Sequence, residues 1–185
     1  MKKQSPITRL GYALLGLLRD QPMSGYDIRR QFAETPMGHY SDSPGAIYPA
    51  LARLERDGYV TGRVDGAKTL RPRKLYRPTA AGKAALTAWI RERPAPRAIV
   101  DATPDWLLRL AFATGVLSGA EAADLLQAID DACSAYAREL QTHADAMPKQ
   151  AVYPRMALDH GIASYRATAS WAGACVAQLG KERRK

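Results

Sequence analysis

The side chains with the clearest chemistry in this sequence are the cations between Arg63 and Arg77. This stretch holds six Lys and Arg residues against a single acid, Asp65, which gives it a net charge of +5. Guanidinium and ammonium groups at this density bind phosphates and carboxylates through ion pairs and charge-assisted hydrogen bonds. The pattern therefore indicates a surface for a polyanion: nucleic acid, an anionic membrane surface or an acidic protein.

The excess of positive charge belongs to one half of the chain. The 185 residues carry a net charge of +9, and residues 1–93 alone hold 17 Lys and Arg against 8 Asp and Glu. Residues 94–185 hold ten of each sign and are neutral. The longest apolar stretch, Leu10–Leu18, is too short to span a bilayer, and no cleavage site follows it. We therefore expect a cytoplasmic protein that makes no membrane contact.

Residues that would support catalysis or metal binding do not occur at useful spacings. Cys133 and Cys175 lie 42 residues apart, and no CxxC motif is present. The three histidines are His39, His143 and His160. They have no metal-ligand spacing, and the sequence contains no phosphate-binding loop and no nucleophile motif. We expect neither an enzyme nor a bound metal or cofactor.

Helical periodicity predicts three helices before the basic stretch. The first runs from about Ser5 to Arg19 and buries Leu10, Leu14, Leu17 and Leu18. The second starts at Ser24, which forms a capping-box-like pair with Asp27, and ends at Pro36 and Gly38. The third starts at Ser43 and buries Ile47, Leu51 and Leu54. These residues account for the faces that would hold the three helices together.

The period then changes from that of a helix to that of a strand. Tyr59–Val64 and Arg73–Arg77 are predicted to form a β-hairpin with a long polar connection, Asp65–Pro72. Thr79 caps a fourth helix that carries Leu86, Trp89 and Ile90. A helix offered to the major groove beside a basic hairpin is the layout of a winged helix-turn-helix. The predicted fold is mainly α with a small β-hairpin wing.

This layout assigns DNA-contacting roles to residues on both elements. The amino-terminal end of a recognition helix meets base edges, whereas cations one or two turns later and on the wing meet phosphates. Pro49 conflicts with a regular first turn, because it removes a backbone hydrogen bond to the Gly45 carbonyl, so this turn should be bent or loose. The predicted DNA-binding residues are Ser24, Tyr26, Ser43, Gly45, Ala46, Tyr48, Pro49, Arg53, Arg56, Lys68, Arg71, Arg73 and Lys74.

Beyond the proline-broken boundary Pro94–Pro96, the second half is predicted to contain only helices. One short helix spans Asp105–Ala113, and Ser118 with Glu121 forms a capping box before a long helix. Pro148 and Pro154 are expected to break the chain before a last helix. Heptad-like seams on the two long helices fit packing within one chain or a dimer interface. The residues assigned to dimerisation are Leu126, Ile129, Cys133, Tyr136, Leu140, Ile162, Tyr165, Ala169, Ala172 and Val176.

Several blocks of the first half, in order, resemble the PadR family of bacterial transcriptional regulators. The blocks are Leu14–Leu18 (LLGLL), Ser24–Ile28 (SGYDI), Gly45–Val60 (GAIYPALARLERDGYV) and Pro72–Gly82 (PRKLYRPTAAG). The resemblance covers about residues 8–92. It places the recognition helix at about Ser43–Arg56 and the wing at about Tyr59–Arg77. Pro78 and Leu75 depart from the family pattern, in which an aliphatic residue and an aromatic residue are usual.

The resemblance implies a sequence-specific, dimeric repressor of the larger PadR subfamily. Such a repressor would have a winged-helix DNA-binding domain, residues 1–93, and a helical dimerisation and effector domain, residues 94–185. Its partner would be double-stranded DNA with an inverted-repeat operator, and a small aromatic or drug-like effector would release it. Candidate effector contacts are Trp106, Tyr165 and Trp171, with Tyr136 and Tyr153 as further aromatic walls. The alternative is a winged-helix interaction module that binds an acidic protein partner.

Overall fold

The computed structural model describes residues 7–35, 44–65, 73–93 and 95–182. It divides into two compact units, Met1–Ile90 and Arg91–Lys185, and the division falls three residues before the boundary predicted from Pro94. Among the residues described, no helix combines the length and apolarity needed to cross a membrane. Within the same ranges, no group of three or more His, Cys, Asp or Glu side chains is arranged to hold a metal ion.

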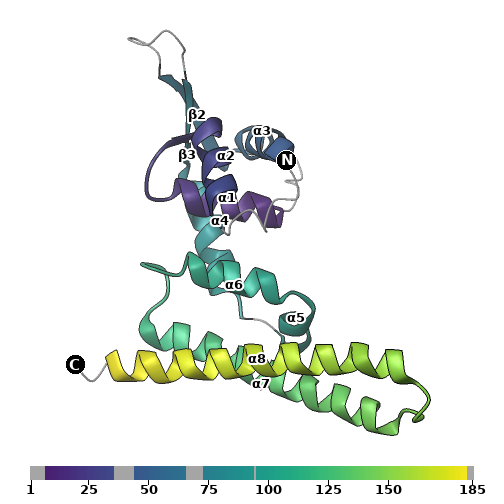
Figure 1. The fold of residues 1–185 in the computed structure, drawn as a ribbon. Helices are drawn as coiled ribbons and strands as arrows, with labels where there is room; N and C mark the ends of the chain where they lie inside the picture. Colours follow the sequence, from purple (N-terminus) through teal and green to yellow (C-terminus); the bar gives the residue numbers. More distant parts are fainter. Residues whose placement is uncertain (1–6, 36–43, 66–72, 94, 183–185) are drawn as a thin grey trace. The chain divides into compact units, whose positions relative to one another are not determined.

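The first unit contains helices and a small antiparallel sheet (Figure 1). Its elements are α1 (Arg9–Leu18), β1 (Met23–Ser24), α2 (Gly25–Glu34), η2 (Pro44–Ala46), α3 (Ile47–Arg56), β2 (Val60–Asp65), β3 (Arg73–Pro78) and α4 (Ala80–Arg91). The strand order in the sheet is β1-β3-β2, with both pairings antiparallel. This is the winged helix-turn-helix that the sequence predicts, and the hairpin strands are confirmed.

Helix α1 and strand β1 of the first unit differ from the prediction. Helix α1 begins at Arg9, where Thr8 accepts a hydrogen bond from the Gly11 N–H, so Ile7 and Thr8 are not helical. Leu15 is completely buried, whereas Leu10 and Leu17 are only half-buried. Helix α1 contacts both α3 and β3, so its buried face is wider than a single stripe of leucines. Strand β1 was not predicted, because two residues carry no period.

The first unit has a core of aliphatic side chains contributed by every helix. Ile28 of α2, Ile47 and Leu51 of α3 and Leu14 of α1 are all fully buried. Burial of a side chain of this size stabilises a fold by about 1.5–3 kcal/mol. The predicted inner face of α3 is confirmed, and this core fixes α3 so that its opposite face points away from the unit.

The second unit is entirely helical in the residues described. It contains α5 (Pro96–Asp101), α6 (Thr103–Ala111), α7 (Gly119–Ala146) and α8 (Val152–Glu182), and the two long helices lie side by side (Figure 1). The capping box of Ser118 and Glu121 at the start of α7 is confirmed. Helix α5 was missed, since six residues between prolines give no periodic signal.

Pro154 does not break the chain, contrary to the prediction. It is the third residue of α8, which starts at Val152. The first N–H groups of a helix have no partner within that helix, so a proline there removes no hydrogen bond. Pro148 does follow the end of α7, which is capped at Met147.

Candidate nucleic-acid interface

Helix α2 is held at its amino-terminal end by a complete capping box. The Ser24 hydroxyl accepts a hydrogen bond from the Asp27 N–H (3.2 Å), and an Asp27 carboxylate oxygen accepts from the Ser24 N–H (3.2 Å) and hydroxyl (2.6 Å). Ser24 is only 4% exposed. Its side chain is therefore the predicted cap of α2, although Ser24 was also predicted as a DNA contact. Tyr26, two residues further along the chain, is exposed to solvent.

Asp27 makes the stability of the first unit depend on pH. The Ser24 hydroxyl bond, the backbone bond and the nearby Arg73 and Arg30 lower the pKa of Asp27 below its ordinary value of 3.8. A lowered folded-state pKa means that the charged cap stabilises the fold above about pH 4 and that this contribution is lost as pH falls through the folded pKa. Asp27→Asn should therefore cost about 0.5–1 kcal/mol near neutral pH and progressively less below pH 4.

Urea unfolding of the wild type and Asp27→Asn between pH 2.5 and 7 measures this difference. Asp20→Asn, at an exposed carboxylate of the same unit, is the control and should stay within about 0.5 kcal/mol of the wild type at each pH. A loss in Asp27→Asn that is equally large at pH 2.5 would contradict the role of the ionised carboxylate.

The predicted recognition helix begins later than the sequence suggested. Ser43 lies outside the described residues, and Pro44–Ala46 form a turn of 3-10 helix before α3 starts at Ile47. Pro49 is then the third residue of α3, where no N–H is required, so the predicted conflict is relieved by this shift of the start. Gly45 and Pro49 are exposed, and Ala46 is half-buried.

Tyr48 is the large side chain that this turn presents to solvent, with 48% of its surface exposed. Its ring lies against the backbone of Gly25 at the start of α2. A Cβ atom at Gly25 would come within 2.5 Å of Tyr48 Cε1. The glycine therefore gives the Tyr48 ring its place beside α2, a contact between the two helices of the motif that the sequence analysis did not identify.

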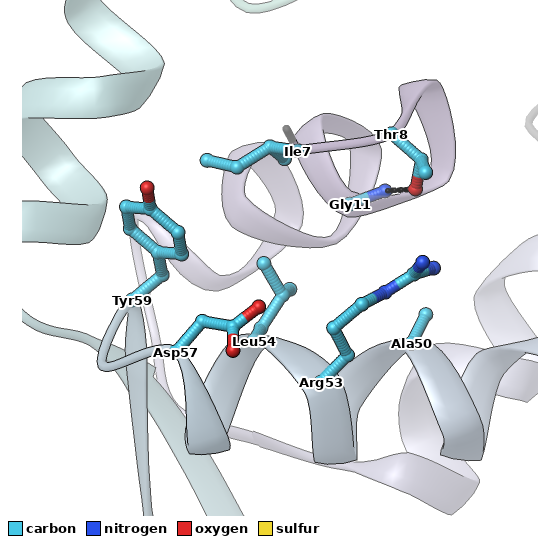
Figure 2. Close-up of a pocket in the computed structure, with 8 residues that line it drawn as sticks. All are labelled: Ile7, Thr8, Gly11, Ala50, Arg53, Leu54, Asp57 and Tyr59. Carbon is cyan, nitrogen blue, oxygen red and sulfur yellow. Dashed lines mark hydrogen bonds between the residues drawn. The ribbon is translucent and has the colours of Figure 1, made fainter. Parts of the chain in front are cut away.

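The two arginines of α3 have different surroundings. Arg56 is exposed and pairs with its neighbour Asp57, with 3.2 Å between Nε and Oδ1. Arg53 is half-buried and reaches from α3 toward Thr8 and Gly11 at the start of α1 (Figure 2). The cavity that these residues line has a volume of about 10 Å³, enough for one water molecule. Arg56 is therefore the more accessible of the two predicted phosphate contacts.

The strands of the wing divide its side chains between two faces. Cross-strand partners share a face, so Arg63, Arg73, Leu75 and Arg77 lie on one side of the hairpin and Lys74 and Tyr76 on the other. The three arginines are exposed. Only Arg73 among them was predicted as a DNA contact, although the alternation of positions along the strands indicates all three. Lys68 and Arg71 lie outside the described residues.

Lys74 is paired with an acid of the recognition helix. Its Nζ donates to Glu55 Oε2 at 2.7 Å, and this hydrogen bond raises the pKa of Lys74. The other Glu55 oxygen, Oε1, accepts from the Gly62 N–H of β2 at 3.1 Å. Lys74 was predicted as a DNA contact, whereas Glu55 and Gly62 were not assigned any role.

The residues assigned to dimerisation lie largely inside the second unit. Leu126, Ile129, Cys133, Ala169 and Ala172 belong to one buried cluster between α7 and α8, and burial raises the pKa of the Cys133 thiol. Tyr136, Tyr165 and Val176 are partly buried against this cluster. Ile162 is buried, and Leu140 is half-buried. The seams thus pack one chain's own helices together.

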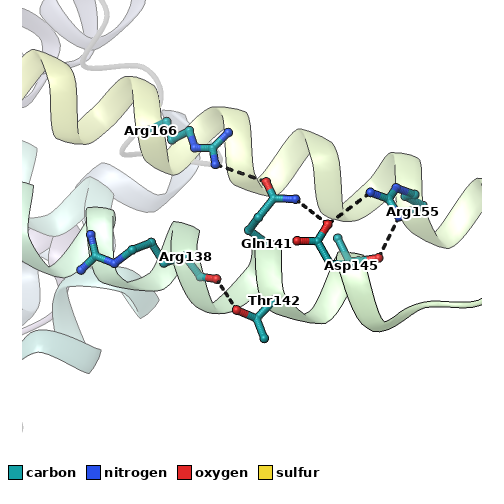
Figure 3. A network of polar contacts seen from close by, with 7 residues as sticks. Arg138, Gln141, Thr142, Asp145, Arg155 and Arg166 are labelled. Atoms are coloured by element: carbon teal, nitrogen blue, oxygen red, sulfur yellow. Dashed lines mark hydrogen bonds and ion pairs between the residues drawn. The ribbon is translucent and has the colours of Figure 1, made fainter.

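A polar network also joins the two long helices (Figure 3). Arg155 of α8 donates to the Ala144 carbonyl (2.9 Å) and contacts Asp145 (3.5 Å), and Arg166 donates to Gln141 (3.2 Å). Gln141 in turn donates to Asp145 at 3.0 Å. These contacts add polar links between α7 and α8 to the apolar packing of the buried cluster.

The aromatic residues considered for an effector do not form one group. Trp106 is buried in the core, and Tyr165 packs edge-on against Tyr136, with 4.9 Å between ring centroids. Burial and the neighbouring Tyr136 raise the pKa of Tyr165. Trp171 and Tyr153 are exposed on α8. Only Trp106, Tyr136 and Tyr165 therefore belong to the same cluster.

Two family models match this chain, one within each of its two units. Residues 14–88 match the model of the transcriptional regulator PadR-like family, and residues 105–180 match that of the virulence activator alpha C-term family. The negative transcriptional regulator PadR of Bacillus subtilis is 38% identical over 64% of this chain and 63% of its own length. The chain spans less than two thirds of the length of the curated relatives it matches.

Two solved structures of Bacillus subtilis PadR are also similar. One is a complex with operator DNA: it is 30% identical, with 95% of this chain and 99% of that chain covered, and the TM-score is 0.44. The other is a complex with p-coumaric acid: it is also 30% identical, with 94% and 99% covered and a TM-score of 0.42.

Proposed function

Because the chain belongs to the PadR-like family of transcriptional regulators, we propose that it is a repressor that binds an inverted-repeat operator as a homodimer and leaves it when a small aromatic molecule binds. The family is one of regulators and not of enzymes. The observation that carries the proposal is the exposed start of α3, with Tyr48, in the same unit as a wing face of three exposed arginines.

The geometry of the first unit supports roles for its two elements. The major groove, about 12 Å wide, admits one helix, and the exposed first turn of α3 would meet base edges there. Arg56 and the arginine face of the wing would contact phosphates, and an arginine of the wing would enter a narrow minor groove. Tyr26 at the start of α2 would contact the backbone of the duplex.

The dimer follows from the symmetry that an inverted repeat requires. Two recognition helices must be held about 34–36 Å apart, and the neutral helical unit is the part of the chain that would link them. Since its seams pack α7 on α8, the contacts between protomers would come from the faces of these helices that remain exposed, together with the seam residues at their margins. The effector would enter beside the aromatic side chains of this unit, Tyr136 and Tyr165.

A gel-shift series on the DNA upstream of the protein's own gene tests the function. We expect tight binding to one inverted repeat, with log K falling against log salt by about 0.9 for each phosphate neutralised. Equal affinity for every duplex would contradict sequence-specific recognition. Absence of binding at physiological salt would favour the alternative, in which the arginine face of the wing binds an acidic protein partner.

Tyr48→Ala is expected to reduce discrimination between operator and unrelated DNA by roughly tenfold or more, because it removes one base contact, which is worth about 1–3 kcal/mol. Gly25→Ala should give a similar but smaller loss, because its methyl group displaces the Tyr48 ring. Arg56→Ala is the matched control and should weaken binding to both duplexes alike. Fluorescence anisotropy with the two duplexes gives the ratio. A Tyr48→Ala loss that is equal on both duplexes would remove Tyr48 from base recognition.

A further inference from the structure

We propose that Glu55, Gly62 and Lys74 form a clasp that positions the wing on the recognition helix, with Glu55 as the positioning residue. One carboxylate of α3 is bonded to both strands of the wing: Oε1 accepts from the Gly62 N–H of β2 at 3.1 Å and Oε2 accepts from Lys74 Nζ of β3 at 2.7 Å. Glu55 is half-buried and Lys74 is exposed, with 32% and 42% of their side-chain surfaces accessible. The inference rests on the proposed function.

Gly62 is the position that lets Lys74 reach the helix. A Cβ atom there would lie 2.2 Å from Lys74 Cε, 2.8 Å from Glu55 Oε1 and 3.1 Å from Tyr76 Cε1. The lysine stem therefore crosses the strand where a side chain is missing. Its ammonium group also lies 5.3 Å from the centre of the Tyr76 ring, a cation–π contact that favours the same path.

The clasp also completes the backbone bonding of an edge strand. Strand β2 is at the edge of the sheet in the order β1-β3-β2. An N–H at such an edge needs a partner other than a neighbouring strand, and Glu55 supplies it for Gly62. The Glu55 side chain thus bonds to the open edge of β2 and links this edge to α3, the helix that would enter the major groove.

Two consequences follow for DNA binding. The clasp fixes the angle between α3 and the hairpin, so it fixes which phosphates the wing meets when α3 lies in the groove. The charge of Lys74 is engaged by Glu55, so among the described residues of the wing the phosphate contacts come from Arg63, Arg73 and Arg77 on the opposite face. Lys74 therefore acts through the wing's position and not as a phosphate ligand.

The sign of the effect at Glu55 distinguishes these two roles. If Lys74 bound a phosphate directly, Glu55→Gln would release it and add positive charge, and operator binding would tighten. The clasp predicts instead that Glu55→Gln and Lys74→Met each weaken operator binding about five- to tenfold, and that the double variant is no weaker than either single variant. Arg73→Met should reduce the salt slope by about 0.9, and Lys74→Met should leave it unchanged. Tighter binding by Glu55→Gln, or additive losses in the double variant, would overturn the proposal.

Hydrogen exchange tests the contacts of the clasp without DNA, so their failure can be distinguished from a failure of the proposed function. In the full-length protein, Glu55→Ala should speed exchange of the Gly62 amide and of the β2–β3 peptides, whereas Glu55→Gln, which keeps an oxygen acceptor, should preserve the Gly62 amide. Gly62→Ala should speed exchange in the same peptides. Gly119→Ala is the control, because nothing lies within 4 Å of a Cβ atom there. Unchanged exchange in the wing of Glu55→Ala would overturn the proposal even if the wild type binds its operator.

Discussion

Replacing Gly82 with alanine is expected to lower the free energy of unfolding of the first unit by roughly 3 kcal/mol, at the upper end of overpacking costs. A Cβ atom at Gly82 would lie 2.0 Å from the carbonyl oxygen of Tyr59 and 3.2 Å from Leu15 Cδ2. The carbonyl is backbone, and it already accepts a hydrogen bond from the Thr79 N–H at 3.0 Å. The backbone carbonyl cannot move aside cheaply, so α4 must shift from the base of the wing.

Helix propensity alone gives the opposite expectation, because alanine is favoured over glycine inside a helix by about 1 kcal/mol. The sign of the change in the free energy of unfolding therefore shows whether the close approach to Tyr59 outweighs the helix propensity of alanine. Urea unfolding followed by circular dichroism measures it, and Lys83→Ala, the next and exposed residue of α4, is the control that should stay within about 0.5 kcal/mol. A Gly82→Ala variant as stable as the wild type would show that the junction between α4 and β2 is loose.

The elements of this fold follow from the sequence where an apolar period extends over several residues or a capping box marks the start of a helix. The helices with apolar stripes, the two capping boxes and the hairpin strands were all predictable in this way. Prolines were the main source of error. Ile47-Tyr48-Pro49 and Val152-Tyr153-Pro154 each open a helix, with proline at the third position, where it costs no hydrogen bond. A proline inside an apolar pattern thus has two interpretations, and only the position of the helix start decides between them.

The site was predictable to a smaller extent, since residue type shows charge but not the partner of that charge. Lys74 and Arg73 are adjacent and equally basic in the sequence, yet alternation along β3 puts them on opposite faces. One meets Glu55, and the other lies close enough to lower the pKa of Asp27. Ser24 was predicted both as the α2 cap and as a DNA contact, and its hydroxyl is engaged by the cap.

Trp106 and Trp171 are expected to respond very differently to truncation, although both were candidates for an effector contact. Trp106 is 3% exposed, donates from its indole N–H to the Ala98 carbonyl at 3.2 Å and lies under the Arg109 guanidinium at 3.9 Å. Trp106→Ala should therefore lower the free energy of unfolding of the second unit by about 3–5 kcal/mol. Trp171 is 38% exposed, and Trp171→Ala should cost about 1 kcal/mol.

This contrast bears on the effector site. A ligand stabilises a protein through a side chain that lines an open site, but it does not replace the packing that a core side chain supplies. Thermal melts with and without p-coumaric acid as the probe separate the two roles. They compare the wild type with Trp106→Phe, Trp106→Ala and Trp171→Ala. Trp106→Phe should recover most of the stability, since the phenyl ring fills the core and only the indole hydrogen bond is lost. If Trp106→Ala melts close to the wild type and loses only a shift caused by the probe, Trp106 lines a ligand site and not the core between α5, α6 and α7.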